Sequence, residues 1–89
     1  MLRPSYVTQF KRDYKLQQKR HKDINLLDDI IRALVKEQLL PTKNKDHPLQ
    51  GDYKGHRECH IEPDWLLIYK IEGSDIYFIR TGTHSDLFK

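Results

Sequence analysis

The sequence predicts a small α+β domain in which two N-terminal antiparallel helices pack on a small antiparallel sheet. Apolar residues repeat at helical spacing up to about residue 40, and at strand spacing after residue 53. Helical and strand segments follow one another in blocks instead of alternating, which is typical of α+β proteins. A chain of 89 residues fits one domain, residues 1–89, that buries roughly 60–65% of its unfolded surface.

The first predicted helix runs from Tyr6 to about Arg20. Val7, Phe10 and Tyr14 fall at i, i+3 and i+7 and form its apolar stripe, while Lys and Arg residues take the other side. A polar joint at residues 20–22 follows. This joint is short enough for the next helix to pack antiparallel to the first.

Asp23 is the expected N-cap of the second helix, because its carboxylate can accept from the first free backbone N–H groups. Apolar side chains repeat at helical spacing over residues 24–35. We expect the helix to end near Leu40, since Pro41 disfavours helical geometry in the residue before it.

Three strands follow. Residues Tyr53 to Ile61 alternate in polarity, Trp65 to Ile71 are apolar on both faces, and Asp75 to Arg80 return after a turn at residues 72–74. Pro63 favours a tight turn between the first two strands. Residues 2–5 can add a short edge strand.

Composition excludes several classes of protein. No apolar run approaches the ~18–20 residues of a membrane span, and the N-terminus lacks the apolar core of a signal peptide. The single cysteine, Cys59, cannot form an internal disulfide, which fits a reducing cytosol. We therefore expect a cytoplasmic protein.

Charge is unevenly distributed along the chain. Residues 1–22 hold seven Lys or Arg against one acid, a local charge of +6, whereas residues 46–89 hold five basic and eight acidic residues, or −3. A concentrated basic face indicates a polyanion or an acidic protein as partner. A solvated helix face with no partner is the alternative.

Histidines and one carboxylate are the candidates for chemistry. His60 ends one predicted strand and Asp64 starts the next, while His84 follows the last strand, whose end lies beside the start of the middle strand. His47, in the loop before the sheet, can be brought to the same edge. Imidazoles titrate near pH ~6.5, so a pair of them can supply a general base and a general acid at neutral pH. Solvent-exposed histidines and a simple turn aspartate are the alternatives.

A metal site is not expected. His56 and His60 are four residues apart, which suits a shared metal only on a helix, and here the alternation predicts a strand. Cys59 then faces away from His60 and packs in the core. The four glycines are dispersed and form no phosphate-binding loop.

Four motifs resemble the YafQ-type toxins of the RelE/ParE superfamily, which belong to bacterial type II toxin–antitoxin modules. They are KRHKDIN (19–25), KDHPLQG (45–51), YKGHRECHIEPDWLLIYKI (53–71) and IRTGTHSDLF (79–88). The resemblance covers nearly the whole chain. It implies a RelE-like fold and a ribosome-dependent endoribonuclease that cleaves messenger RNA in the decoding site.

The resemblance also implies a set of catalytic residues and a reaction that needs no metal and no cofactor. His84 and His47 would be the acid–base pair, with their individual roles left open, and His60 would contact the phosphate. Asp64 would orient an imidazole or make it more basic, and Phe88 would stack on a base, unless its ring closes the core instead. Arg57 and Arg80 could contact phosphates or be structural. The catalytic set is His47, His60, Asp64, His84 and Phe88.

The implied partners are the ribosome, messenger RNA and a DinJ-like antitoxin with an acidic C-terminal part. Ribosomal RNA would be held through salt-sensitive contacts by basic residues of the first helix and the following joint. These are Lys11, Arg12, Lys15, Lys19, Arg20 and Lys22. The antitoxin would cover either this surface or the catalytic edge.

Two other functions remain open from the sequence. One is a toxin of the same superfamily that acts by binding, as the gyrase-poisoning members do, although such a toxin needs no titrating groups at these positions. The other is a plain RNA-binding module that uses the basic helix. In that case replacing His84 would leave growth inhibition unchanged.

Overall fold

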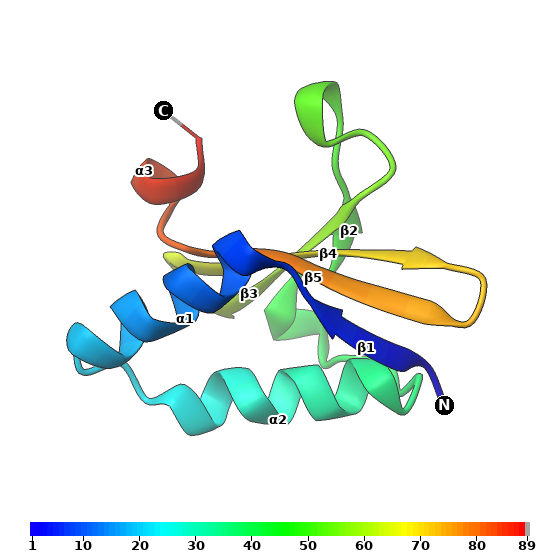
Figure 1. Cartoon of the computed structure of the whole chain (residues 1–89), viewed down its shortest axis with the longest axis horizontal. Helices are drawn as coiled ribbons and strands as arrows, with labels where there is room; N and C mark the ends of the chain where they lie inside the picture. Colours follow the sequence, from blue (N-terminus) through cyan, green and yellow to red (C-terminus); the bar gives the residue numbers. More distant parts are fainter. Residues whose placement is uncertain (89) are drawn as a thin grey trace.

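The structure, a computed structural model, describes residues 1–88 and contains a five-stranded sheet in the order β1-β5-β4-β3-β2. Two helices cover one face of the sheet, and α3 with the segment around residue 50 lies on the other side (Figure 1). In chain order the elements are β1 (Arg3–Tyr6), α1 (Thr8–Lys19), α2 (Ile24–Val35), η1 (Thr42–Asn44), β2 (His47–Pro48), η2 (Gly51–Tyr53), β3 (Arg57–Glu62), β4 (Trp65–Glu72), β5 (Asp75–Gly82) and α3 (His84–Leu87).

The sheet is antiparallel from β2 to β5 and parallel at one edge. β1 pairs with β5 in parallel, with Tyr6 opposite Phe78. The predicted edge strand is therefore present, but the expectation of a purely antiparallel sheet is wrong there. β2, of two residues, forms the other edge and is too short to be recognised from a sequence pattern.

Two helix boundaries differ from the predicted ones. α1 starts at Thr8, because Tyr6 belongs to β1. In α2, the Asp23 cap is confirmed, since its carboxylate accepts from the Asn25 N–H at 3.2 Å. The helix ends at Val35 and not near Leu40: Glu37 takes a left-handed φ of 59°, and the Gln38 N–H turns back to the Ala33 carbonyl.

The first predicted strand of the main sheet is shorter than expected. Tyr53 belongs to the η2 turn, and β3 begins only at Arg57, after Gly55 with a φ of 88°. β4 and β5 form the predicted hairpin, and Gly82 at the end of β5 pairs with Leu66 near the start of β4. This register places the start of α3 beside the turn at residues 63–64.

The core occupies both faces of the sheet, which explains why β4 is apolar on both sides. Trp65, Leu67 and Tyr69 pack under the helices, and Leu66 and Ile68 pack against α3 and the segment around residue 50. Cys59 is fully buried with the helix-side cluster, as predicted, and burial raises the pKa of its thiol. Over residues 1–88, no helix is long and apolar enough to cross a membrane.

Candidate active site

Three histidine rings from three different elements lie in a row. The ring centroids of His47 (β2) and His60 (β3) are 6.2 Å apart, and those of His60 and His84 (α3) are 5.8 Å apart. The sheet register creates this row, because His47 lies opposite Glu58 on β3 and α3 follows the end of β5 directly. Three residues spread over a 38-position span of the sequence thus meet at one site. This site lies on the side of the sheet away from α1 and α2 (Figure 1).

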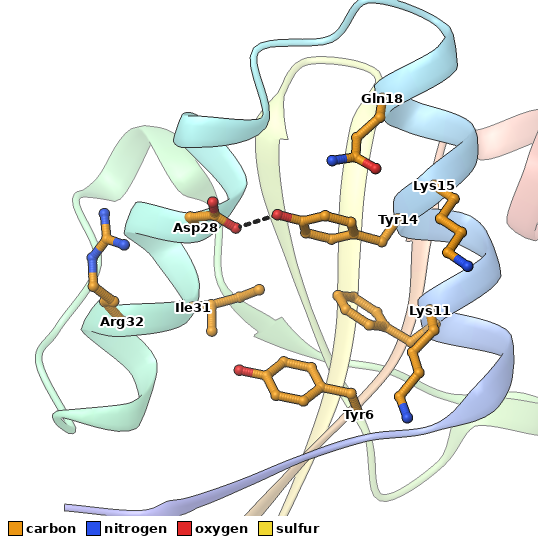
Figure 2. Close-up of a pocket in the computed structure, with 9 residues that line it drawn as sticks. Tyr6, Lys11, Tyr14, Lys15, Gln18, Asp28, Ile31 and Arg32 are labelled. Atoms are coloured by element: carbon orange, nitrogen blue, oxygen red, sulfur yellow. Dashed lines mark hydrogen bonds between the residues drawn. The ribbon is translucent and has the colours of Figure 1, made fainter.

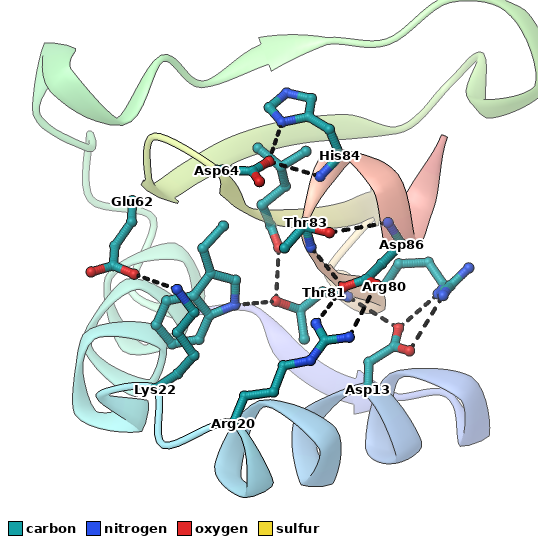
Figure 3. Close-up of polar contacts among 12 residues, drawn as sticks. Asp13, Arg20, Lys22, Glu62, Asp64, Arg80, Thr81, Thr83, His84 and Asp86 are labelled. Carbon is teal, nitrogen blue, oxygen red and sulfur yellow. Dashed lines mark hydrogen bonds and ion pairs between the residues drawn. The ribbon is translucent and has the colours of Figure 1, made fainter. Parts of the chain in front are cut away.

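Asp64 holds His84 through two hydrogen bonds. Its Oδ1 accepts from the His84 backbone N–H at 2.9 Å and lies 2.5 Å from the ring Nδ1 (Figure 3). Since a carboxylate only accepts, Nδ1 carries a proton and Nε2 is left for other partners. The side chain of Asp64 is 65% exposed. The His84 backbone N–H, and then the His84 ring, lower the pKa of Asp64, so it is ionised at neutral pH.

His84 itself is placed by the short helix α3. Thr83 caps this helix through a capping box with Asp86, in which the Thr83 Oγ1 accepts from the Asp86 N–H at 3.1 Å and Asp86 accepts from the Thr83 N–H at 2.9 Å. The Arg20 side chain donates to both oxygens of Asp86, at 2.6 and 3.2 Å (Figure 3). This ion pair and the Thr83 contacts hold the pKa of Asp86 well below its usual range.

His60 and His47 are each held by a backbone carbonyl. The His60 Nδ1 lies 3.3 Å from the Pro63 oxygen, and the His47 Nδ1 lies 2.5 Å from the Lys45 oxygen. The segment before His47 is fixed by Asp46, which accepts from the Tyr69 hydroxyl at 2.7 Å. All three rings therefore have a fixed Nδ1 partner.

Glu58 is a functional candidate that sequence reasoning missed. Its side chain is 7% exposed, and its Oε2 lies 3.0 Å from the Nε2 of His47. The sequence does hold a signal for Glu58: at two-residue spacing, it shares one face of the predicted strand with His56 and His60. What the sequence could not give was β2, whose pairing brings His47 opposite Glu58.

Phe88 follows α3 directly, with its backbone N–H donating to the His84 carbonyl at 2.8 Å, and 42% of its surface is exposed. Its ring meets the edge of Tyr53 at 5.8 Å, with an interplanar angle of 81°. Tyr53 meets His56 in the same way at 5.7 Å. Phe88 is therefore supported on one side and open on the other, a geometry suited to stacking on a base.

The predicted basic residues fall into two groups. Among residues 1–88, Lys11, Arg12, Lys15 and Lys19 of α1 form no ion pair. The others have acidic partners: Arg20 with Asp86, Lys22 with Glu62, Arg57 with Asp46 and Arg80 with Asp13.

Two of these paired residues, Arg80 and Lys22, make further contacts within the fold. Arg80 donates to Asp13 at 2.7 and 3.3 Å, and Asp13 also accepts from the Thr81 N–H. Lys22 lies 5.7 Å from the centroid of the Trp65 ring, besides its pair with Glu62. Their charges are partly balanced inside the molecule, which leaves less for a phosphate.

A separate groove lies between α1 and α2. This groove of about 570 Å³ is lined by apolar rings and bordered by Lys11, Lys15 and Arg32 (Figure 2). Inside it, the Tyr14 hydroxyl donates to Asp28 at 2.8 Å. Burial, together with this bond, raises the pKa of Tyr14 to about 12, so the phenol is no base near neutrality. The groove is suited to a partner protein and not to acid–base chemistry. Over residues 1–88, no group of three or more His, Cys, Asp or Glu side chains is arranged to hold a metal ion.

Fold and site together define a small α+β protein with a row of imidazoles and a carboxylate, the groups that general acid–base catalysis uses. Nearly the whole sequence also matches a family model: residues 2–89 match "Bacterial toxin of type II toxin-antitoxin system, YafQ". The chain belongs to this family.

Individual relatives agree with the family model. The chain is 52% identical over 84 residues to the mRNA interferase toxin YafQ of Escherichia coli K12, covering 93% of this chain and 91% of that protein. The crystal structure of YafQ from E. coli BL21(DE3) superposes with a TM-score of 0.95 at 48% identity, over 100% of both chains. The toxin in a crystal structure of the E. coli DinJ–YafQ complex superposes with a TM-score of 0.93, also at 48% identity and over 100% of both chains.

Proposed function

We propose that the protein is an mRNA interferase: an endoribonuclease that cuts messenger RNA on the ribosome and so stops translation. The observation that carries this proposal is the row of three histidines with Asp64 bound to one of them at 2.5 Å. The relative at 52% identity is named for the same activity. A toxin that acted only by binding would have no use for imidazoles held at fixed nitrogens.

The proposed reaction is an in-line transesterification. One imidazole removes the proton from the ribose 2′-OH, and the 2′ oxygen forms a bond to phosphorus. The bond from phosphorus to the 5′ oxygen breaks, and a second imidazole protonates that oxygen. The products are a 2′,3′-cyclic phosphate and a 5′-hydroxyl. His47 and His84 are proposed as this pair, and His60, between them, contacts the phosphate and stabilises the phosphorane charge.

Asp64 and Phe88 complete the proposed site. Asp64 fixes His84 with its Nδ1 protonated, which leaves Nε2 directed away from the carboxylate to exchange a proton with RNA. The half-exposed Phe88 ring, supported by Tyr53, offers a face to a base pulled out of its stack. Holding one base fixes the scissile phosphate relative to the histidines.

Binding to the ribosome is assigned to the basic residues, most strongly to the four of α1 that have no ion pair, Lys11, Arg12, Lys15 and Lys19. Such contacts with ribosomal RNA are independent of sequence and weaken with salt. Arg20, Lys22, Arg57 and Arg80 contribute less, because each already has an acidic partner. This activity places the protein in the cytoplasm, where ribosomes translate.

The proposed inhibitor is a DinJ-like antitoxin, since the related E. coli toxin was crystallised with DinJ. A segment with apolar and acidic residues matches the groove between α1 and α2, which has rings inside and Lys11, Lys15 and Arg32 at its border (Figure 2). Occupying this groove would also cover part of the proposed ribosome-binding face.

Primer extension tests the proposal. Messenger RNA from cells expressing the wild type should show cuts that are absent with His84→Ala, whereas ribosome-free RNA should stay intact. His21→Asn is the matched control, since His21 lies in the turn between α1 and α2 with a left-handed φ of 61° that Asn tolerates. Growth arrest by His84→Ala with intact messenger RNA would contradict a nuclease and favour a toxin that only binds.

A further inference from the structure

Glu58 is a buried carboxylate that the proposed reaction has not yet used. Only 5% of the residue is exposed, and it lies on β3 directly opposite His47. One oxygen, Oε2, is 3.0 Å from the His47 Nε2. The other, Oε1, is buried and has no hydrogen-bond partner among the described residues.

Packing does not explain a carboxylate at this place. Its neighbour across the sheet is Ile68, which belongs to the apolar cluster on this face. A buried carboxylate with an unpaired oxygen costs free energy relative to an apolar side chain of similar size. A purely structural position would therefore favour an apolar residue, so the contact with His47 is the feature that needs a role.

The hydrogen bonds around His47 fix where its protons are. Nδ1 faces the Lys45 carbonyl at 2.5 Å, and a carbonyl can only accept, so Nδ1 carries a proton. Nε2 faces the Glu58 carboxylate, which also only accepts when ionised. Without a further proton, two lone pairs would point at each other across 3.0 Å. One proton must therefore lie between these two atoms, and since a carboxylic acid is a stronger acid than an imidazolium, it belongs on Nε2, which makes the pair an imidazolium and a carboxylate.

This arrangement differs from that of His84. Asp64 holds His84 at Nδ1 and leaves Nε2 without a protein partner among residues 1–88, whereas Glu58 holds His47 at Nε2, the nitrogen left after Lys45 has taken Nδ1. The His60 ring also faces the His47 ring, at 6.2 Å between centroids. Two histidine–carboxylate pairs thus lie at the two ends of the row, with opposite nitrogens engaged.

We propose that Glu58 is a positioning residue that orients the His47 ring and keeps a proton on its Nε2, and thereby sets one limb of the pH dependence of RNA cleavage. The effect on cleavage rests on the proposed function, but the effect on the ring does not. Replacing Glu58 by Gln keeps the shape and removes the charge. The amide NH₂ can then donate to Nε2, which favours the neutral ring.

The first experiment measures the free toxin, released from its antitoxin, by NMR of the imidazole nitrogens. At one pH near neutrality, the His47 Nε2 should be more protonated in the wild type and in Glu58→Asp than in Glu58→Gln. Glu72→Gln is the control, because it removes the same charge from an exposed site at the end of β4. Equal protonation of Nε2 in the wild type and Glu58→Gln would overturn the proposal.

The second experiment measures single-turnover cleavage of ribosome-bound messenger RNA against pH. Glu58→Gln should lower the maximal rate by up to about 100-fold, as expected when a catalytic ring is misplaced by about 1 Å. It should also move one limb of the profile to lower pH by about 1 unit, the size of effect that one close charge has. Movement of the acidic limb makes His47 the base, and movement of the alkaline limb makes it the acid. An unmoved profile would overturn the proposal.

Thermal unfolding separates this role from a structural one. Glu58→Leu should lose cleavage while its melting temperature stays unchanged or rises, because an apolar side chain suits the site better. Loss of cleavage together with a large fall in melting temperature, in both Glu58→Leu and Glu58→Gln, would make Glu58 structural and overturn the proposal. If the wild type cuts no ribosome-bound messenger RNA, the proposed function fails, and the NMR result still decides the protonation of His47.

Discussion

Arg20 and Asp86, 66 positions apart in the chain, form a bidentate ion pair that joins the end of α1 to α3 (Figure 3). A helix of four residues has no stability of its own, so its position depends on such contacts. The backbone is also tight there: a Cβ on Gly82 would lie 2.8 Å from the Asp86 Oδ2. Asp86 thus connects α1 with α3, the short helix that carries His84.

Asp86→Ala should lower the stability of the fold and remove part of its dependence on pH. The loss combines a helix cap, about 1 kcal/mol, with an ion pair of 0 to about 1 kcal/mol that is partly screened by solvent. The native pKa of Asp86 lies below its ordinary 3.8. Its contribution is therefore complete above pH 3.8 and is lost as the pH falls through the native pKa.

Urea unfolding at pH 7 and at two values below pH 4 measures this effect. The wild type should lose stability more steeply on acidification than Asp86→Ala, so the two curves converge at low pH. The pKa of Asp64 is also lowered, so Asp64 too contributes stability that is lost on acidification. This contribution is the same in the wild type and in Asp86→Ala, and it cancels when the two are compared. A constant difference at every pH would show that the ion pair does not form.

Asp64→Ala should reduce cleavage by up to about 100-fold with little change in folding, because it removes a group that orients a catalytic histidine. Both hydrogen bonds to His84 are lost, and the ring then rotates freely. Asp29→Ala, which removes an exposed carboxylate from α2, is the control and should cut normally. Full activity of Asp64→Ala on ribosome-bound messenger RNA would show that His84 needs no orientation.

Phe88→Ala should weaken the binding of messenger RNA more than it lowers the stability of the fold. Stacking on one base contributes about 1–3 kcal/mol, which corresponds to roughly 5- to 150-fold in the concentration needed for half-maximal cleavage. Phe88→Tyr keeps the ring and should keep most of the affinity. Unfolding measurements decide between the two roles: a ring that closes the core would cost several kcal/mol of stability when truncated.

Replacing Lys11, Lys15 and Lys19 together by Gln should weaken binding to ribosomes and flatten its dependence on salt. Each lost phosphate contact reduces the slope of log K against log[salt] by about 1. Cleavage at saturating ribosome should persist, since none of these residues lies at the histidines. Lys36→Gln, at the far end of α2, serves as the control for charge alone. An unchanged slope would place the ribosome contact elsewhere on the molecule.

Much of the fold could be predicted from periodicity and turn chemistry. The Asp23 cap, the apolar central strand and the hairpin after Ile71 all depend on local patterns, and the structure has them. The convergence of His60, Asp64 and His84 follows from antiparallel pairing alone, because it needs only the order of the strands.

The remainder depends on contacts between distant segments. The early end of α2 results from the left-handed Glu37, and Pro41 gave a boundary five residues too late. β2 has two residues and leaves no periodic signal, so the contact between Glu58 and His47 could not be seen. The acidic partners of Arg80 and Lys22 could not be predicted either, because each lies in a distant segment of the chain. A basic residue in a sequence gives no indication of whether its charge is balanced.

The link between α1 and α3 has an evolutionary consequence. The place that the His84 ring occupies can be tuned from the end of α1, by changing the length or charge of the residue at position 20, while every imidazole stays as it is. Related toxins could in this way drift in which nucleotide they cut beside, without losing the chemistry itself.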